Sequence, residues 1–194
     1  MTGAARAGGA SLHATAVIHG ESGVLILGPS GSGKSALALA LLARARTTGV
    51  FGALIGDDRI FVSKAHGRLI ARGAANMAGV IERRSAGLIT VPHEPVAVVR
   101  LAVELCERGR RWSRMPSDDD GLVVGEVTLP RLALDSNLSV CDQVLAIEER
   151  LAGLNRLESD AIGNFALTFR RSAQKWAAEE SAAGLMAPEY EPID

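Results

Sequence analysis

The chain has 194 residues, of which 47% are hydrophobic, and its formal net charge is −1 from 21 basic and 22 acidic side chains. This length and apolar content are sufficient for one core and one enzyme-sized domain. The near-neutral balance excludes a global positive field of the kind that attracts nucleic acid, so no nucleic-acid partner is expected. No segment is long and apolar enough to span a bilayer, which excludes a membrane partner as well.

The ends and the cysteines indicate a cytoplasmic protein. Residues 1–10 are rich in Gly and Ala without an apolar core, which predicts a disordered tail rather than a signal peptide or anchor. Residues 187–194 hold two prolines and three acids and are predicted to be a frayed tail. Cys106 and Cys141 lie in apolar segments without metal-ligand spacing, so both are expected to be buried, reduced thiols.

Strands dominate the predicted elements at the start of the chain. Residues 11–18 alternate loosely and predict a first strand, and 20–22 predict a turn. The apolar run 23–27 is suited to a buried parallel strand, and the strong helix formers at 36–45 predict a helix. A short strand is expected at 53–55.

The rest of the chain changes from strand to helix near residue 139. Residues 60–63 and 68–71 predict a hairpin, and residues 80–84 and 87–91 predict two further strands around a turn. The apolar run 96–105 predicts a central strand, and the polar stretch 108–121 predicts a loop. Strand character returns at 122–134. From 139 onward the apolar residues recur at helical spacing, beginning with Val144, Ile147 and Leu151.

The most informative motif is the run Gly-Pro-Ser-Gly-Ser-Gly-Lys-Ser, which fills every fixed position of the phosphate-binding pattern G-x-x-x-x-G-K-[ST]. It lies between a predicted strand and a predicted helix, where backbone N–H groups and the helix dipole face an anion. We therefore expect a bound nucleoside triphosphate, with Lys34 on its β- and γ-phosphates and the Ser35 hydroxyl on Mg²⁺. The predicted nucleotide-binding residues are Gly28, Pro29, Ser30, Gly31, Ser32, Gly33, Lys34 and Ser35.

Two adjacent carboxylates, Asp57 and Asp58, follow the predicted strand 53–55. In P-loop proteins an acid at such a strand end holds Mg²⁺ or orients the nucleophile. Alternation along a strand would point the two side chains in different directions, so they can divide these tasks, with Asp57 as a magnesium ligand. The structural alternative is an ordinary Gly-Asp-Asp turn, but its place after a phosphate-binding motif favours the functional interpretation.

Spacing alone does not decide whether three other residues have a structural or a functional role. Glu82 lies within the predicted strand 80–84 and fits a solvated edge position as well as a functional one. His13 fits a structural histidine as well as a catalytic one. Arg114, in a basic segment, fits either a surface loop or a group that stabilises phosphoryl charge.

The ordered set of motifs resembles the catalytic domain of HPr kinase/phosphorylase. That family has a histidine before the loop, then Gly-Val-Leu-Ile, the phosphate loop, and a strand that ends in Ala-Asp-Asp. This sequence has His13, then Gly-Val-Leu-Ile at 23–26, the phosphate-binding motif, and Gly-Asp-Asp at 56–58. The family signature Ile-Glu-x-Arg-Gly-x-Gly-Ile is similar to residues 81–88. Residues 114–116 and 127–135 resemble short alphaproteobacterial members, so the resemblance covers about residues 13–135.

The resemblance implies an α/β fold of the P-loop NTPase class with a phosphoenolpyruvate-carboxykinase-like core. We expect one kinase domain at 11–186, with a helical C-terminal segment from about 139. The family is cytoplasmic and often hexameric, which implies a homo-oligomer. Its activity is the ATP- and Mg²⁺-dependent phosphorylation of a serine on HPr, a small phosphocarrier of the sugar phosphotransferase system, and the reverse phosphorolysis.

Carried over by position, the resemblance implies a role for each open residue. Asp58 would accept the proton of the substrate serine, and His13 would support that carboxylate. Lys34 would bind the phosphates, and Ser35 with Glu82 would bind the metal. Arg114 would stabilise the transferring group. An aligned carboxylate and charge neutralisation are what phosphoryl transfer to a poor nucleophile requires.

Two departures from the family pattern favour kinase activity over phosphorylase activity. Ser85 stands where the second signature usually has glycine. A Pro-x-x-x-Gly-Arg-Asn type segment, which the family uses in dephosphorylation, is absent after the last core strand, where 134–138 read Leu-Asp-Ser-Asn-Leu.

Two other classes of function remain alternatives. A small-molecule P-loop kinase or nucleotide hydrolase would need an arginine-rich lid, for which only residues 108–114 are a candidate. An ATP-sensing regulator without transfer activity would have no need of the acid pair.

Overall fold

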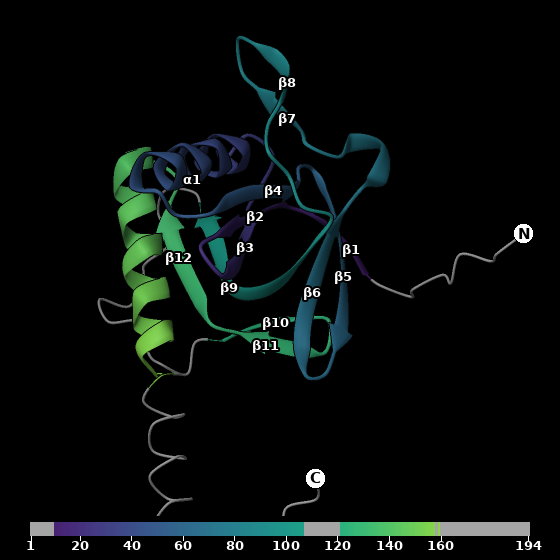
Figure 1. Cartoon of the computed structure of the whole chain (residues 1–194), viewed down its shortest axis with the longest axis vertical. Coiled ribbons are helices and arrows are strands. Elements are labelled where there is room, and N and C mark those ends of the chain that lie inside the picture. The colour runs from purple at the N-terminus through teal and green to yellow at the C-terminus, as the bar shows by residue number, and fades with distance from the viewer. Residues whose placement is uncertain (1–9, 107–120, 158, 160–194) are drawn as a thin grey trace, which may run out of the picture. The chain divides into compact units, whose positions relative to one another are not determined.

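The computed structural model describes residues 10–106, 121–157 and 159 (Figure 1). The chain divides into two compact units, Met1–Leu151 and Ala152–Asp194. The elements below belong to the first unit, except for the end of the last helix. Of the second unit the structure describes 152–157 and 159, which are helical.

A mixed eight-stranded sheet forms the centre of the first unit, in the order β1-β5-β6-β9-β3-β2-β4 with β12 also paired to β9. The β9 strand runs parallel to β3 and β12 and antiparallel to β6. The strands of this sheet are β1 (Ala10–His13), β2 (Thr15–His19), β3 (Ser22–Leu27), β4 (Gly52–Gly56), β5 (Arg59–Ala65), β6 (Arg68–Gly73), β9 (Val96–Cys106) and β12 (Arg131–Asp135).

Two small hairpins, a 3-10 helix and two α-helices complete the described fold. The hairpins are β7 (Val80–Arg83) with β8 (Gly87–Thr90), and β10 (Leu122–Val124) with β11 (Val127–Leu129); the 3-10 helix is Ala75–Met77. Helix α1 (Lys34–Thr48) packs on β2 and β4, and the second helix covers residues 140–157. No helix among the described residues is long and apolar enough to cross a bilayer.

The predicted first strand, 11–18, is wrong in one respect, because the structure has two strands there. The β1 strand pairs with β5, whereas β2 pairs with β3 and β4. The fully buried Ala14 lies between them. Residues 11–18 alternate only loosely between apolar and polar, so the sequence pattern could not show that the pairing partner changes. The predicted strand region 122–134 likewise contains three strands, β10, β11 and β12.

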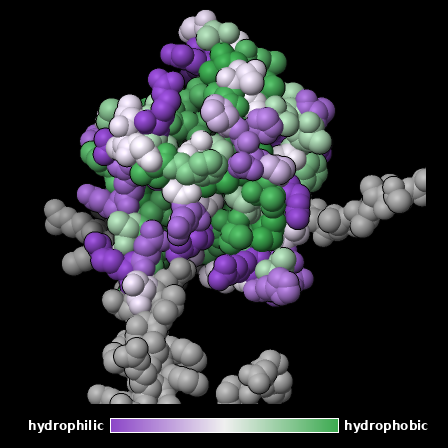
Figure 2. Space-filling view, in the orientation of Figure 1, coloured by the Kyte–Doolittle hydropathy of each residue, from purple (hydrophilic) through white to green (hydrophobic). Residues whose placement is uncertain are grey.

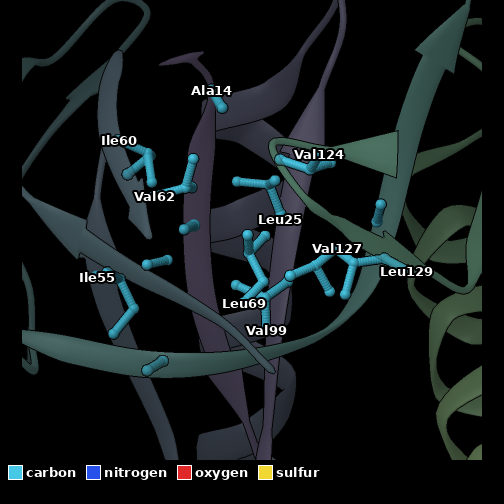
Figure 3. Close-up of a cluster of buried hydrophobic side chains, with 14 residues drawn as sticks. Ala14, Leu25, Ile55, Ile60, Val62, Leu69, Val99, Val124, Val127 and Leu129 are labelled. Carbon is cyan, nitrogen blue, oxygen red and sulfur yellow. The ribbon is translucent and has the colours of Figure 1, made fainter. Parts of the chain in front are cut away.

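Buried apolar residues pack on both faces of the sheet. Fourteen buried residues form one cluster (Figure 3), in which Val124, Val127 and Leu129 of the β10–β11 hairpin lie over strand residues such as Leu25. Alternation along β3 turns its other buried residues to the opposite face, where α1 buries Leu37 and Leu41. The β3 strand is therefore covered on both faces, which explains its continuous apolar sequence.

The C-terminal helical prediction is confirmed over its described part. The helix begins after Ser139, whose Oγ accepts a hydrogen bond from the backbone N of Asp142 at 3.1 Å, as expected for an N-cap. Val144, Ile147 and Leu151 are buried as their spacing predicts. Cys141 is exposed, contrary to expectation, because it precedes the buried part of the helix; Cys106 is buried, and both thiols are free.

Candidate active site

The glycine-rich loop, residues 28–35, connects the end of β3 to the start of α1, as the motif predicts. Its first glycine is required by a close approach: a Cβ on Gly28 would lie 2.8 Å from the Leu105 carbonyl oxygen of β9. Gly33, with φ of 98°, is the N-cap residue of α1 and is in the left-handed region that favours glycine. Parallel pairing of β3 with β9 thus presses the loop against its neighbouring strand.

Lys34, at the first position of α1, turns back onto the loop. Its Nζ donates to the carbonyl oxygens of Gly28 and Pro29, each at 3.0 Å, and lies 3.1 Å from Nε2 of His13. Burial lowers the pKa of Lys34 below its usual value of 10.5, an effect that the carboxylates of Asp57 and Asp58 oppose. A buried ammonium with three acceptors around it matches the three donors of the group.

His13 links this lysine to Asp58. Its Nδ1 lies 2.8 Å from Oδ1 of Asp58 and 3.2 Å from the Asp58 backbone oxygen. The Lys34 ammonium has no acceptor, so Nε2 of His13 must accept its hydrogen bond and the imidazole proton is assigned to Nδ1, facing the Asp58 carboxylate. The result is a chain of contacts from the glycine-rich loop through the imidazole to a carboxylate that is 81% exposed.

Asp57 and Asp58 do point to different partners, but strand alternation is not the reason. The β4 strand ends at Gly56, and Asp58 has a φ of 64° in the left-handed region. The two residues therefore lie in a tight turn, which directs Asp57 towards the loop and Asp58 towards His13. A positive φ is tolerated best by Asn, Asp and Gly, so the turn that the sequence suggested and the carboxylate pair are the same feature.

Asp57 joins three elements. Its Oδ1 accepts hydrogen bonds from the Ser35 hydroxyl at 3.1 Å and from the Thr15 hydroxyl at 2.6 Å, and its Oδ2 accepts one from the backbone N of Glu82 at 3.3 Å. The structure thus brings together the three residues predicted to bind metal, Ser35, Asp57 and Glu82. Thr15 was missed, because one buried hydroxyl within an apolar strand forms no motif.

Two adjoining cavities meet at the His13–Asp58 pair. The larger, of about 940 Å³, is lined by the loop, one side of α1, the carboxylate pair and the β7–β8 hairpin, including Glu82. The smaller, of about 290 Å³, is lined by Ser11, Leu12, His13, Asp58 and Arg59. Each cavity includes both His13 and Asp58, so this pair forms a shared wall.

The larger cavity has an apolar part as well. Figure 1 shows the β7–β8 hairpin projecting beyond the sheet beside α1, with which β7 is in contact. In Figure 2 hydrophobic residues reach the surface among hydrophilic ones in that part of the molecule. The cavity-lining Leu88 and Met77 are 65% and 37% exposed. Arg114 lies outside the described residues, after the end of β9.

The fold and site define a mixed α/β protein with a central curled sheet, whose glycine-rich loop lines a cavity with polar and apolar parts. The model of the HPr serine kinase C-terminal domain matches residues 6–95. Curated HPr kinase/phosphorylases from Geobacillus thermodenitrificans and Bacillus licheniformis are 29% and 28% identical, over 72% and 74% of this chain and 50% and 52% of their own lengths. One from Clostridium acetobutylicum is 26% identical over 58% of this chain and 38% of its own.

A solved structure agrees in fold. The Hpr(Ser) kinase/phosphatase from Coxiella burnetii superimposes with a TM-score of 0.62 at 22% identity, covering 75% of this chain and 99% of that one. The chain spans about half the length, or less, of the curated relatives it matches. These comparisons confirm the resemblance to HPr kinase/phosphorylase that the motifs indicate.

Proposed function

We propose that this protein is a cytoplasmic P-loop kinase with a phosphoenolpyruvate-carboxykinase-like core, which uses ATP and Mg²⁺ to phosphorylate a serine of an HPr-type phosphocarrier protein. The observation that carries the proposal is the contact chain Lys34–His13–Asp58, which joins a phosphate-binding motif to an exposed carboxylate. The family relationship supports the reaction type and the acceptor.

The nucleotide would lie in the larger cavity, with its phosphates on the backbone N–H groups of residues 28–35. Lys34 would exchange its loop carbonyls for the β- and γ-phosphates. The hard oxygen donors of Ser35, Asp57 and Glu82 suit Mg²⁺, and the first two already lie 3.1 Å apart. When bound, the ion would neutralise phosphate charge.

The acceptor serine would reach Asp58 from the smaller cavity, on the other side of the shared wall. As the serine Oγ forms its bond to the terminal phosphorus, its proton would pass to Asp58 and the bond to the ADP oxygen would break. His13 contacts Asp58 and would hold its carboxylate in position. Asp58 is exposed and carries one imidazole contact, so its carboxylate remains accessible to a substrate hydroxyl.

Three further expectations belong to this proposal. Arg114 would add a cation to the transferring group. The protein would act as a homo-oligomer, hexameric as in the family. Reverse phosphorolysis would be much slower than the forward reaction, because the turn after β12 is an Asp135–Asn137 motif, in which Oδ1 of Asp135 accepts from the Asn137 backbone N at 2.8 Å, and it offers no arginine for phosphate capture.

The test is transfer of label. The chain is incubated with γ-labelled ATP, Mg²⁺ and HPr, and the labelled product is identified as phosphoserine; HPr with its acceptor serine replaced by Ala is the control. We expect label on wild-type HPr and none on the alanine variant. Release of inorganic phosphate without labelled HPr would favour a nucleotide hydrolase, and ATP binding without turnover would favour a sensor. Phosphoserine HPr supplied with phosphate then measures the reverse rate, and a rate equal to the forward one would contradict the directional expectation.

A further inference from the structure

A second positive group lies against the glycine-rich loop. It comes from the β7–β8 hairpin, whereas Lys34 comes from α1. Arg84 is part of the turn that joins β7 to β8, where the backbone N of Ala86 donates to the Arg83 oxygen at 3.0 Å. Its Nη2 donates to the carbonyl oxygen of Gly31 at 3.4 Å. Residues 53 positions apart are thus brought together at the tip of the loop.

The hairpin turn holds this arginine at some energetic cost. Ser85, the next residue, has a φ of 70°, in the left-handed region where a side chain costs about 1–2 kcal/mol relative to the right-handed one. A β-turn with positive φ at its third residue is normally made with glycine. Such strain persists where the surrounding structure determines it and is common at ligand sites.

The β7 strand that leads into this turn is tied to the carboxylate turn. The backbone N of Glu82, two residues before Arg84, donates to Asp57, and Ile81 is buried. The hairpin therefore contacts Asp57 through Glu82 of β7 and the glycine-rich loop through Arg84 of the turn. Arg84 and Asp58 line the same cavity as the glycine-rich loop, so Arg84 lies within the space in which a nucleotide on the loop and the proposed base would meet.

The contact with Gly31 leaves most of the guanidinium available. A guanidinium has five N–H donors, and a donor–acceptor distance of 3.4 Å is at the long limit of a hydrogen bond. A bidentate fork suits phosphate oxygens better than one carbonyl oxygen. An arginine that only stabilised the loop would be expected to make shorter and more numerous contacts with it.

We propose that Arg84 is a phosphate-binding residue of this site, which leaves Gly31 to contact the terminal phosphoryl group of the bound nucleotide and stabilises its charge during transfer. The proposal rests on the function proposed above and adds to it a cation from the β7–β8 hairpin. Arg84 reaches the site from the same hairpin that supplies Glu82, so this hairpin and the loop enclose the phosphate chain between them.

Calorimetry with two nucleotides tests this role. Affinities for a non-hydrolysable ATP analogue and for ADP, each with Mg²⁺, are measured for the wild type, Arg84→Gln and Arg84→Lys. Arg84→Gln should weaken binding of the ATP analogue about tenfold or more, the effect of one charge-assisted contact, and leave ADP affinity within about twofold. Arg84→Lys, which keeps the charge but loses the fork, should fall between. Arg68→Gln, at the start of β6 and outside both cavities, should change neither affinity.

The outcomes separate this inference from the proposed function. Wild-type binding of the ATP analogue with unchanged affinity in Arg84→Gln would overturn the role of Arg84 and leave the kinase proposal intact. Equal losses for ATP analogue and ADP would place Arg84 on another phosphate or in loop stability and would also overturn it. Absence of nucleotide binding by the wild type would overturn the proposed function and this inference together.

Discussion

The buried strands of the sheet and the exposed turns at its edge differ in what their residues do. Leu25 of β3 and Leu101 of β9 are fully buried, and neither has a polar group to contribute. Asp58 and Arg84 lie in turns and are exposed, and the side chain of Asp58 contacts His13 whereas that of Arg84 contacts the glycine-rich loop. Lys34 is the exception, because it is buried and charged. The comparison teaches that stability and proposed chemistry are carried by different residues, and that they meet at the start of α1.

The sharpest way to test this separation is to remove the proposed base without altering shape. Asp58→Asn should reduce phosphoryl transfer to HPr by about 10²- to 10⁴-fold, because the amide cannot accept the serine proton. Binding of Mg·ATP and the unfolding midpoint should change little, since the side chain is exposed. Rates come from labelled transfer and affinity from calorimetry. Glu149→Gln, an exposed change on the 140–157 helix, is the control. Near-normal transfer by Asp58→Asn would place the base elsewhere.

A substitution in the core should lower stability without altering phosphoryl transfer. Leu25→Ala should lower the free energy of unfolding by about 2–5 kcal/mol, because it leaves a cavity in the core cluster. Urea unfolding measures the loss, and transfer per folded molecule should stay near the wild-type value. The matched deletion Leu145→Ala, at a position that is 49% exposed, should cost far less. If transfer per folded molecule fell as steeply as stability, the two regions would not be separable.

Lys34 is buried like the core residues but is proposed to act on the nucleotide, so stability and chemistry are not separated at this position. Lys34→Ala should weaken ATP affinity by well over tenfold, because it removes a charge-assisted contact to the phosphates. Calorimetry with Mg·ATP measures the loss, with Lys64→Ala, an exposed lysine on β5, as the control. Unchanged affinity in a folded Lys34→Ala protein would refute the assignment of residues 28–35 as a phosphate site.

The smallest effect concerns the strained hairpin turn. Ser85→Gly should raise the free energy of unfolding by about 0.5–1 kcal/mol, because glycine adopts the left-handed region without steric cost. Ser85→Ala keeps the Cβ and should show no such gain. Thermal unfolding of the three proteins measures the difference. A gain in both variants would mean that the hydroxyl, rather than the backbone conformation, is unfavourable.

Several elements could be predicted because their signals are local. The run at 23–27, the glycine-rich motif and the helix formers after it predicted β3, the loop and α1, and the comparison with known proteins confirms the family resemblance. The hairpin predicted from residues 60–63 and 68–71 is present as β5 and β6. The two strands within 11–18 were not separable, since their difference lies in the partner and not in their own pattern.

Residues of the candidate site could be named from the sequence, but only one of the contacts between them was anticipated. The resemblance implied that His13 supports the Asp58 carboxylate, but neither motif nor resemblance indicated that the same histidine also contacts Lys34. Thr15 and Arg84 enter the site through contacts across 42 and 53 positions of the chain. Contacts of that range leave no periodicity in a single sequence.

The sequence by itself determined the phosphate-binding motif, the turn that carries two carboxylates, and the apolar runs of the sheet, because each depends on the conformational preferences of a few neighbouring residues. Only the tertiary structure decided which of these features meet. Pairing of β1 with β5 brings His13 beside the Asp57–Asp58 turn, and parallel pairing of β3 with β9 positions the loop. Such pairings are selected by burial of apolar surface over the whole sheet, a property that no local segment contains.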